Sequence, residues 1–219
     1  MKILENIEIN YSNEKIDYLD SINFMEKRVS EINANKREEL IWFLNHDHLY
    51  TMGTSGSKNE IRSEINIPLI KTNRGGKITY HGPGQRIIYF LIDLKKRKKD
   101  IRMFVSSIEN AVILLLKEFN LEALTFNDRI GIWVTKNKNT LLPKERKIGA
   151  IGLRLKKWTT YHGLSFNINH DLNYFEKIDA CGLKDYQSTS MKDLGIKIST
   201  KEFDKLFLSY FLKELKKLK

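Results

Sequence analysis

The chain has 219 residues, of which 41% are hydrophobic and 30% are charged, as is ordinary for a folded globular protein. This length supports one good hydrophobic core or at most two small ones, and only three prolines argue against long disordered linkers. The net charge of +11 is less ordinary. It could reflect an acidic partner, which would be nucleic acid, an anionic membrane surface or a protein, or it could come from lysine runs on solvated faces.

The apolar segments of the chain are short. The first ten residues, MKILENIEIN, hold no stretch long enough for a signal peptide, and the longest apolar run, AVILLL at 111–116, is far below a membrane span. The single cysteine excludes an internal disulfide and a thiolate metal cluster within the chain. The sequence therefore predicts a cytoplasmic, soluble protein that has no membrane partner.

Hydrophobic periodicity predicts the elements of the first half. Apolar residues three or four apart over residues 14–34 favour an amphipathic helix, whereas residues 39–47 are short and rich in branched and aromatic side chains, which favours a strand. Residues 86–94 are typical of a buried strand. Asp100 is expected to cap a helix that runs to about Phe119.

The second half predicts strands followed by a helix. Residues 131–136 and 147–155 favour two strands joined by a polar turn. Residues 158–169 alternate and place one set of side chains on one face: Trp158, Thr160, His162, Leu164, Phe166 and Ile168. Residues 203–218 carry one apolar stripe, which predicts a final docking helix. This element order predicts one α/β or α+β domain.

The segment RGGKITYHGPGQ at 74–85 concentrates glycines beside polar side chains. It lacks the Ser or Thr of a P-loop and the third glycine of a dinucleotide-binding loop. A β-hairpin with turns at 75–76 and 82–84 accounts for the glycines but leaves Arg74 and His81 unexplained. Glycines also allow a ligand to lie against backbone, so substrate contact is the alternative.

The cysteine and the histidines each have a structural and a functional interpretation. Cys181 is either a small buried hydrophobe or a nucleophile, and a reactive thiol needs a cationic or basic neighbour. His46 and His48 could share a metal from one strand face, although no further ligands cluster nearby and a structural role is favoured. His162 is either a core histidine or a site residue, and the sequence alone does not decide.

Four segments in this order resemble the lipoyl(octanoyl) transferases: RGGKITYHGPGQ, KIGAIGLRL, HGLSFNIN followed by DL, and ACGL. The likeness runs from about Trp42 to Leu183, and LYTMGTSG at 49–56 is also in keeping. The resemblance implies the α/β fold shared with biotin and lipoate protein ligases, which is a central mixed sheet flanked by helices. It also implies a single octanoyltransferase catalytic domain over residues 1–219.

The resemblance implies transfer of an octanoyl group from acyl carrier protein to a lysine of a lipoyl domain. The acceptors would be 2-oxoacid dehydrogenase complexes and the glycine cleavage H protein. Cys181 would form the acyl thioester, with Lys147 as its partner. No ATP, metal or other cofactor and no nucleic acid would be needed, and the chain is expected to be a monomer. The matching positions that would line the acyl site are Arg74, Gly75, Gly76, Lys77, Ile78, Thr79, Tyr80, His81, Ala150, Ile151, Gly152, Gly163, Leu164 and Ser165.

Details of the acyl site follow from these assignments. A β-carbon at Gly75 or Gly76 is expected to intrude on the groove for the acyl chain. His81 and backbone amides near 162–163 are expected to support the negative charge that develops on the thioester carbonyl. Lys77 stands where the family commonly has glutamine. Strand alternation turns it away from its neighbours' face, so we expect it to add charge at the rim without taking part in chemistry.

Lys147 has two possible tasks that differ in size. A cysteine with a pKa of ~8.5 is already a few per cent thiolate near neutral pH, so lowering that pKa can raise the thiolate fraction by at most ~30-fold. Proton transfer among thiol, leaving group and amine can contribute ~10²–10⁴-fold. We therefore predict that proton transfer is the larger role.

Three other classes of protein share some of these sequence features. ATP-dependent lipoate and biotin ligases commonly show His-Asp where this chain has His81-Gly82, and they do not depend on the cysteine. A nucleic-acid-binding module predicts aromatic residues interleaved on a basic face, which the lysine runs lack. A Cys–His hydrolase needs an orienting third residue, and none is apparent. Acidic acyl carrier proteins would also account for the basic charge, with KKRKK at 95–99 as one candidate contact.

Overall fold

The computed structural model describes residues 2–4, 6–127, 129–138, 140–182 and 186–218. The helices and strands follow in chain order: β1 (Lys2–Leu4), β2 (Ile7–Lys15), α1 (Tyr18–Asn33), β3 (Glu39–Asn45), β4 (Leu49–Met52), η1 (Lys58–Glu60), β5 (Leu69–Lys71), β6 (Ile78–His81), β7 (Gln85–Leu91), η2 (Leu94–Lys96), α2 (Ile101–Lys117), β8 (Leu121–Leu124), β9 (Ile132–Asn137), β10 (Thr140–Lys156), β11 (Thr159–Asn167), α3 (Asn173–Glu176), η3 (Ala180–Gly182) and α4 (Thr200–Lys216).

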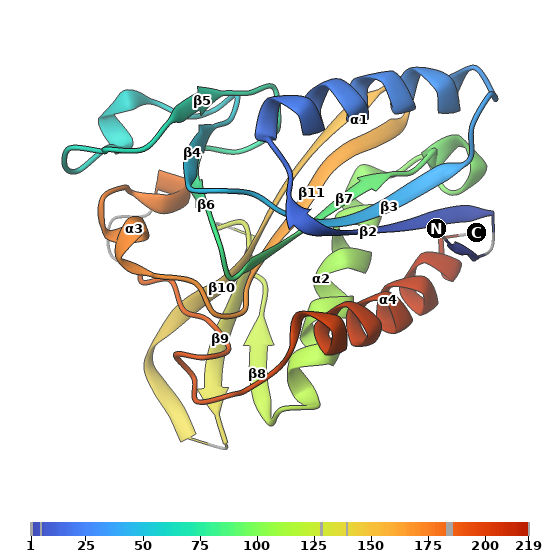
Figure 1. Ribbon diagram of the computed structural model, residues 1–219. Coiled ribbons are helices and arrows are strands. Elements are labelled where there is room, and N and C mark those ends of the chain that lie inside the picture. The colour runs from blue at the N-terminus through green and yellow to red at the C-terminus, as the bar shows by residue number, and fades with distance from the viewer. Residues whose placement is uncertain (1, 5, 128, 139, 183–185, 219) are drawn as a thin grey trace.

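A large mixed sheet forms the centre of the fold (Figure 1). In the described part of the chain it has eight strands in the order β1-β2-β3-β7-β11-β10-β9-β8, with β2 and β3 parallel and the other neighbours antiparallel. A smaller sheet has the order β5-β4-β6 and lies beside it. A mixed sheet flanked by helices confirms the predicted α/β class.

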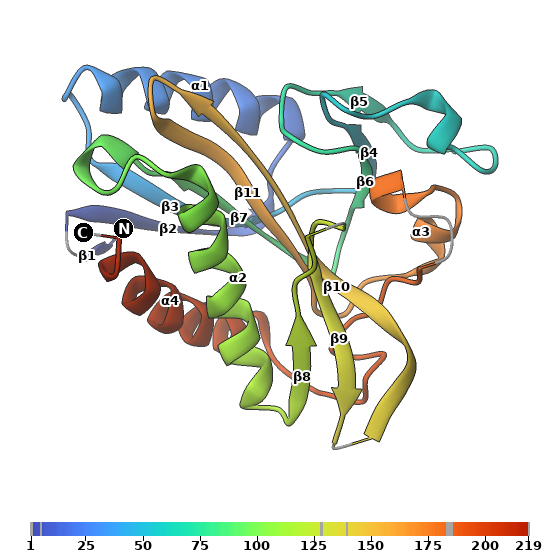
Figure 2. The same ribbon diagram turned by 180° about the vertical axis from the view of Figure 1, so that it is seen from behind.

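Helices cover both faces of the large sheet. α1 packs on one face, while α2 and α4 pack against each other on the opposite face, as Figure 2 shows. Each of the three helices begins at a side chain that accepts a backbone N–H: Asp17, Asp100 and Ser199. The Asp100 cap and the helix after it were predicted from the sequence, and both are confirmed.

The hydrophobic core follows this layering. β7 is buried along its whole length because its two faces meet different helices. Ile88 and Phe90 pack towards α2 and α4, whereas Ile87 and Tyr89 pack towards α1. A third cluster joins the smaller sheet to α3. Two-sided burial explains why residues 87–91 of this strand form a continuous apolar run.

The glycine-rich segment is not the hairpin that the sequence allowed. β6 pairs with β4 in the smaller sheet, whereas β7 pairs with β3 and β11 in the larger one. The turn at 82–84 therefore carries the chain from one sheet to the other. Gly84 has φ +83, and a β-carbon there would collide with the backbone of Asn169. This connection places β6 and β7 at the junction where the site lies.

The predicted alternation of residues 158–169 breaks at His162. Leu164, Phe166 and Ile168 pack in the cluster under α2 and α4. The His162 ring instead stacks on that of Tyr161, which belongs to the cluster under α1. His162 has φ +60, so the backbone does not follow the regular pleat at this residue. The shared face predicted for this segment is therefore wrong at His162, and it is also wrong at Trp158, which is exposed in the turn before β11 with φ +68.

Candidate active site

A cavity of about 540 Å³ lies where β10 passes between β9 and the glycine-rich segment. The pairing of β9 with β10 reaches Gly149, and the N–H of Gly75 donates to the carbonyl of Leu153, 3.1 Å away. Residues 150–152 line the cavity between these two attachments. The volume is typical of a small-molecule site.

The structure brings most of the sequence-predicted acyl-site residues to this cavity. Residues 77, 79 and 81 line it from one face of the segment, whereas Ile78 and Tyr80 are buried in the cluster beneath the smaller sheet. The predicted positions in the lining are Arg74, Gly75, Gly76, Lys77, Thr79, His81, Ala150, Ile151, Gly152, Gly163, Leu164 and Ser165. Ile78 and Tyr80 lie outside the lining because the strand alternates.

The glycines act chiefly through close backbone approach. A β-carbon on Gly75 would lie 2.9 Å from the Leu153 carbonyl oxygen, and one on Gly152 would lie 2.9 Å from the Gly75 carbonyl oxygen. Gly75 is thus required by its contact with β10 rather than by the groove itself. Gly76 has φ +88, which favours glycine, and a β-carbon built there would lie 3.5 Å from Nη1 of Arg74.

Arg74 fixes this arrangement from within. Its guanidinium is buried and donates to the backbone carbonyl of Thr51 at 2.7 Å, to the hydroxyl of Thr51 at 2.8 Å and to the carbonyl of Lys77 at 2.8 Å. It therefore ties the glycine-rich segment to β4. Arg74 lines the cavity, and these bonds indicate that it holds the shape of the cavity wall.

His81 belongs to a buried hydrogen-bond chain. Its Nδ1 lies 2.8 Å from Oε1 of Gln85, and its Nε2 lies 3.2 Å from the hydroxyl of Thr51. Gln85 also donates to Asn167, 3.1 Å away. Burial holds the pKa of His81 well below its usual value, and the positive charge of Arg74 acts in the same direction. His81 is thus a neutral, fixed polar group at neutral pH.

His46 and His48 each contact hydrogen-bond partners of their own. His46 contacts the Ile16 carbonyl and the Tyr89 hydroxyl, both at 2.7 Å, whereas His48 contacts the Tyr80 hydroxyl at 2.7 Å. Among the described residues, no group of three or more His, Cys, Asp or Glu side chains could hold a metal ion. The structural role favoured for the His46 and His48 pair is the one these contacts support.

Four buried histidines make folding stability sensitive to acid, and one of them is His81, whose pKa burial also holds well below its usual value. Burial lowers the pKa of His46 to about 4, of His162 to about 3 and of His170 to about 4, whereas an unfolded chain protonates near ~6.5. The unfolded state therefore binds protons first as pH falls below ~6.5. The free energy of unfolding therefore keeps its full value above that pH. It falls between that pH and the pKa that each histidine has in the folded protein, by up to ~1.4 kcal/mol per pH unit for each histidine.

We therefore expect the free energy of unfolding, measured with urea, to fall between pH 7 and pH 5. In His170→Gln the fall is expected to be shallower, because the variant lacks one of the histidines that bind a proton on unfolding. His170 packs against Tyr80 and Phe175 and does not line the cavity, so the substitution leaves the site unchanged. Equal slopes for the variant and the parent would contradict this assignment.

Lys147 reaches the cavity because β10 is irregular at this residue. Lys147 pairs with Trp133 and Gly149 with Ile132, so Ile148 is an extra residue that forms a bulge. The backbone of Lys147 also bonds to residues 187 and 189. Its buried ammonium donates to the carbonyl of Ile130 at 2.7 Å. The bulge aims this side chain at the cavity, while Ile148 points into the core.

Cys181 follows Ala180 in the short helix η3. Its side chain lies outside the described part of the structure, so the predicted pairing with Lys147 stays a prediction. A second, smaller cavity is lined by both Lys147 and Ala180, together with Thr79 and Ser165. The turn that bears the cysteine therefore reaches the same end of the site as Lys147.

The sequence did not reveal the wall formed by α2 and the segment before β9. Ile101, Val105 and Glu109 lie four residues apart on one face of α2 and line the cavity. Burial raises the pKa of the Glu109 carboxyl. The other lining residues outside the predicted set are Tyr18, Ser55, Ile87, Tyr89, Phe126, Arg129, Ile130, Leu153 and His162. The repeat of 101, 105 and 109 was the one available signal.

The geometry defines an apolar slot with a buried lysine at one side, as expected for an enzyme that handles an acyl chain. Residues 17–212 match the lipoyl protein ligase A/B catalytic domain, and the chain belongs to this family. The chain is an acyltransferase. No helix in the described ranges is long and apolar enough to cross a membrane.

Similar proteins support this membership. The octanoyltransferase of Wolbachia pipientis subsp. Culex pipiens is 46% identical over 203 residues, which cover 92% of this chain and 96% of that one. The crystal structure of lipoate-protein ligase A bound with ATP is 16% identical, with a TM-score of 0.70 and coverage of 95% and 86%. The biotin protein ligase of Aquifex aeolicus has a TM-score of 0.56 at 13% identity, with coverage of 98% and 72%. The two structures confirm the predicted fold.

Proposed function

We propose that the chain transfers an octanoyl group from acyl carrier protein to a lysine of lipoyl domains through a thioester on Cys181. The observation that carries the proposal is the position of Lys147 and Ala180 on one small cavity beside the larger apolar one. The relatives named octanoyltransferases support an eight-carbon acyl group. The acceptors are lipoyl domains of 2-oxoacid dehydrogenase complexes and the glycine cleavage H protein.

The reaction has two balanced steps. First, the Cys181 thiolate attacks the donor thioester, and a C–S bond forms between Cys181 and the acyl carbon. The C–S bond to the donor breaks, and the leaving thiolate takes a proton. The two thioesters are close in energy, so this step is nearly reversible. Second, the neutral acceptor amine forms a C–N bond, the Cys181 thioester breaks, and the amine loses a proton. The amide product makes the second step run forward.

Lys147 moves the protons in both steps. Its ammonium can give a proton to the leaving thiolate, and the neutral amine can then take one from the attacking acceptor lysine. The bulge in β10 and the bond to the Ile130 carbonyl fix its position. His81, held neutral by burial, keeps its two ring nitrogens on Gln85 and Thr51, so it fixes the cavity wall rather than the carbonyl oxygen. No metal or cofactor takes part.

The apolar wall that α2 contributes to the cavity accounts for recognition of the acyl chain. Burying about six methylenes at ~0.8 kcal/mol each gives about 5 kcal/mol of binding free energy. Val105→Phe is expected to fill part of the cavity beside this wall, so that roughly two methylenes of the acyl chain lose their contacts. The kcat/KM for octanoyl carrier protein is then expected to fall about tenfold relative to that for butanoyl carrier protein. Met103→Phe, on the exposed face of α2, is the control. An unchanged ratio in Val105→Phe would place the chain elsewhere.

Intact-mass analysis after mixing with octanoyl carrier protein, without ATP, tests the proposal. One octanoyl adduct is expected on the parent protein and none on Cys181→Ser. A parallel sample with free octanoate and ATP distinguishes transfer from ligation, because an ATP-dependent ligase of this fold would use free octanoate and ATP and would not use octanoyl carrier protein. Absence of the adduct on the parent would sink the proposal.

Residues 1–219 are proposed to act as one catalytic domain, as a monomer in the cytoplasm. The net charge of +11 supports encounter with an acidic carrier protein. Transfer rates are accordingly expected to fall as salt is raised.

A further inference from the structure

Lys77 and Glu60 form an ion pair at the cavity wall. Nζ of Lys77 lies 3.1 Å from Oε1 of Glu60, and the Glu60 side chain is 9% exposed whereas that of Lys77 is 43% exposed. The other carboxylate oxygen of Glu60 accepts the N–H of Ile78 at 3.2 Å. Glu60 is therefore anchored to the backbone of β6, and it fixes the end of the Lys77 side chain.

The end of Lys77 lies against the turn that bears Cys181. Gly182 has φ +72, and a β-carbon built on it would overlap the Lys77 ammonium, with Cδ and Cε of Lys77 within 3.0 Å. The ammonium thus occupies the space that the missing side chain of Gly182 leaves open. It contacts the residue that immediately follows the cysteine.

The same ion pair is tied to the chain before the turn. The N–H of Asp179 donates to the backbone carbonyl of Glu60 at 2.7 Å, and the N–H of Gly182 donates to the Asp179 carbonyl at 2.6 Å. The Asp179 carboxylate forms an ion pair with Arg62. The charged groups that face the turn from the packed elements are Glu60, Arg62, Lys77, Lys147 and Asp179.

Both carboxylates in this group already have a cationic partner, and the Lys77 ammonium lies against Gly182 itself. We propose that Lys77, held by Glu60, is a positioning residue that sets a positive charge beside Cys181 and increases the thiolate fraction of its thiol. A nearby cation favours the thiolate because it stabilises the charged form. The inference depends on the proposed function in taking Cys181 as the nucleophile. Lys147 then moves protons, so the two lysines have separate tasks.

Alkylation of the folded protein tests this directly. Cys181 is the single cysteine, so the rate with iodoacetamide reports on that thiol alone. The rate is measured against pH for the parent, Lys77→Met and Lys77→Arg, with Lys71→Met on the exposed end of β5 as the control. In Lys77→Met the midpoint is expected to rise by about 0.5–1 unit, which lowers the rate at neutral pH about three- to tenfold. Lys77→Arg and Lys71→Met are expected to keep the parental midpoint.

An unchanged midpoint of the alkylation rate against pH in folded Lys77→Met would overturn the proposal. A rate that fell equally at every pH would overturn it too, because the substitution would then have altered the turn without changing the pKa of the thiol. An equal shift in Lys71→Met would overturn it as well, since any surface charge would then suffice. Circular dichroism establishes that each variant is folded. A failure of octanoyl adduct formation would contradict the proposed function and would leave the alkylation result to be judged separately.

Discussion

Lys147→Ala is expected to lower octanoyl transfer by about 10²–10⁴-fold, because it removes the group that moves protons in both steps. Alkylation of Cys181 in the same variant is expected to slow by no more than ~30-fold, the limit set by the thiolate fraction. Turnover with octanoyl carrier protein and the rate with iodoacetamide are measured on one preparation. The difference between the two losses separates proton transfer from thiol activation.

Matched variants make the result interpretable. Lys147→Met keeps most of the side-chain volume, so a loss shared by Met and Ala reports on the ammonium rather than on packing. Lys156→Ala removes a lysine from the exposed end of the same strand and is expected to leave both rates unchanged. Equal losses of turnover and alkylation in Lys147→Ala would show that thiol activation is its main role.

The elements with strong local signals were predictable. Asp100 carries the side chain that caps a helix, and residues 87–91 are apolar because the strand is buried on both faces. The chain before Tyr18 was less clear: the predicted helix began at residue 14, but β2 continues to Lys15. A polar outer half of β2 resembles a loop in sequence, and only its parallel pairing with β3 makes it a strand.

The site was predictable where its residues are close together in the sequence. Residues 77, 79 and 81 share a face because they alternate within β6 and the segment before it. The contact of Gly75 with Leu153 joins segments far apart in the sequence, and no local pattern encodes it. The sequence gives no sign of the positive φ of His162 either, since histidine rarely adopts it. The contact of Lys77 with Gly182 is of the same long-range kind.

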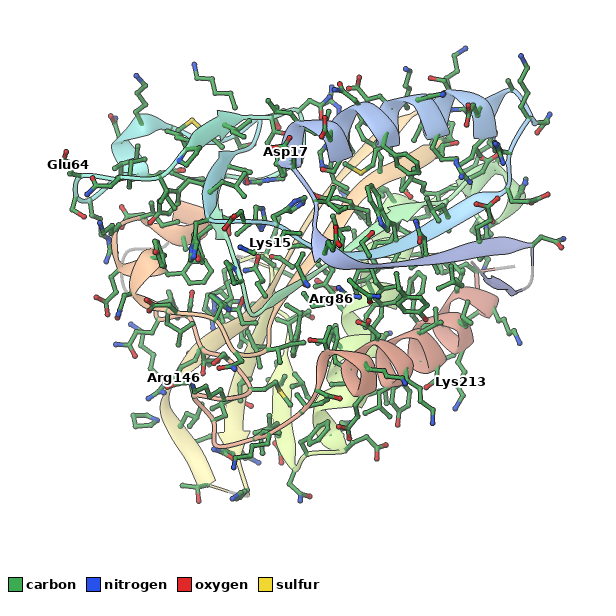
Figure 3. The ribbon with its side chains drawn as sticks, viewed as in Figure 1. Lys15, Asp17, Glu64, Arg86, Arg146 and Lys213 are labelled. Carbon is green, nitrogen blue, oxygen red and sulfur yellow. The ribbon has the colours of Figure 1, made fainter. Side chains whose placement is uncertain are left out.

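Asp204→Ala is expected to lower the free energy of unfolding by about 3–5 kcal/mol, because it leaves a buried guanidinium without its partner. Nε and Nη2 of Arg86 bond to the two carboxylate oxygens of Asp204 at 2.9 and 2.6 Å, and both side chains are buried. Figure 3 shows Arg86 between the sheet and α4. The pair joins β7 to α4 directly beside Gln85, which holds His81 in the site.

Urea unfolding checks this expectation against a pair of opposite character. Lys15 and Asp47 lie 3.2 Å apart with side chains 53% and 67% exposed, so Asp47→Ala is expected to cost far less. The double variant Arg86→Met with Asp204→Leu is expected to recover most of the loss, since no charge then stays buried. If Asp204→Ala cost no more than Asp47→Ala, the buried pair would not be what fixes α4 to the sheet. The hydrophobic contacts of α4 with Phe90 and Phe166 would then position the helix alone.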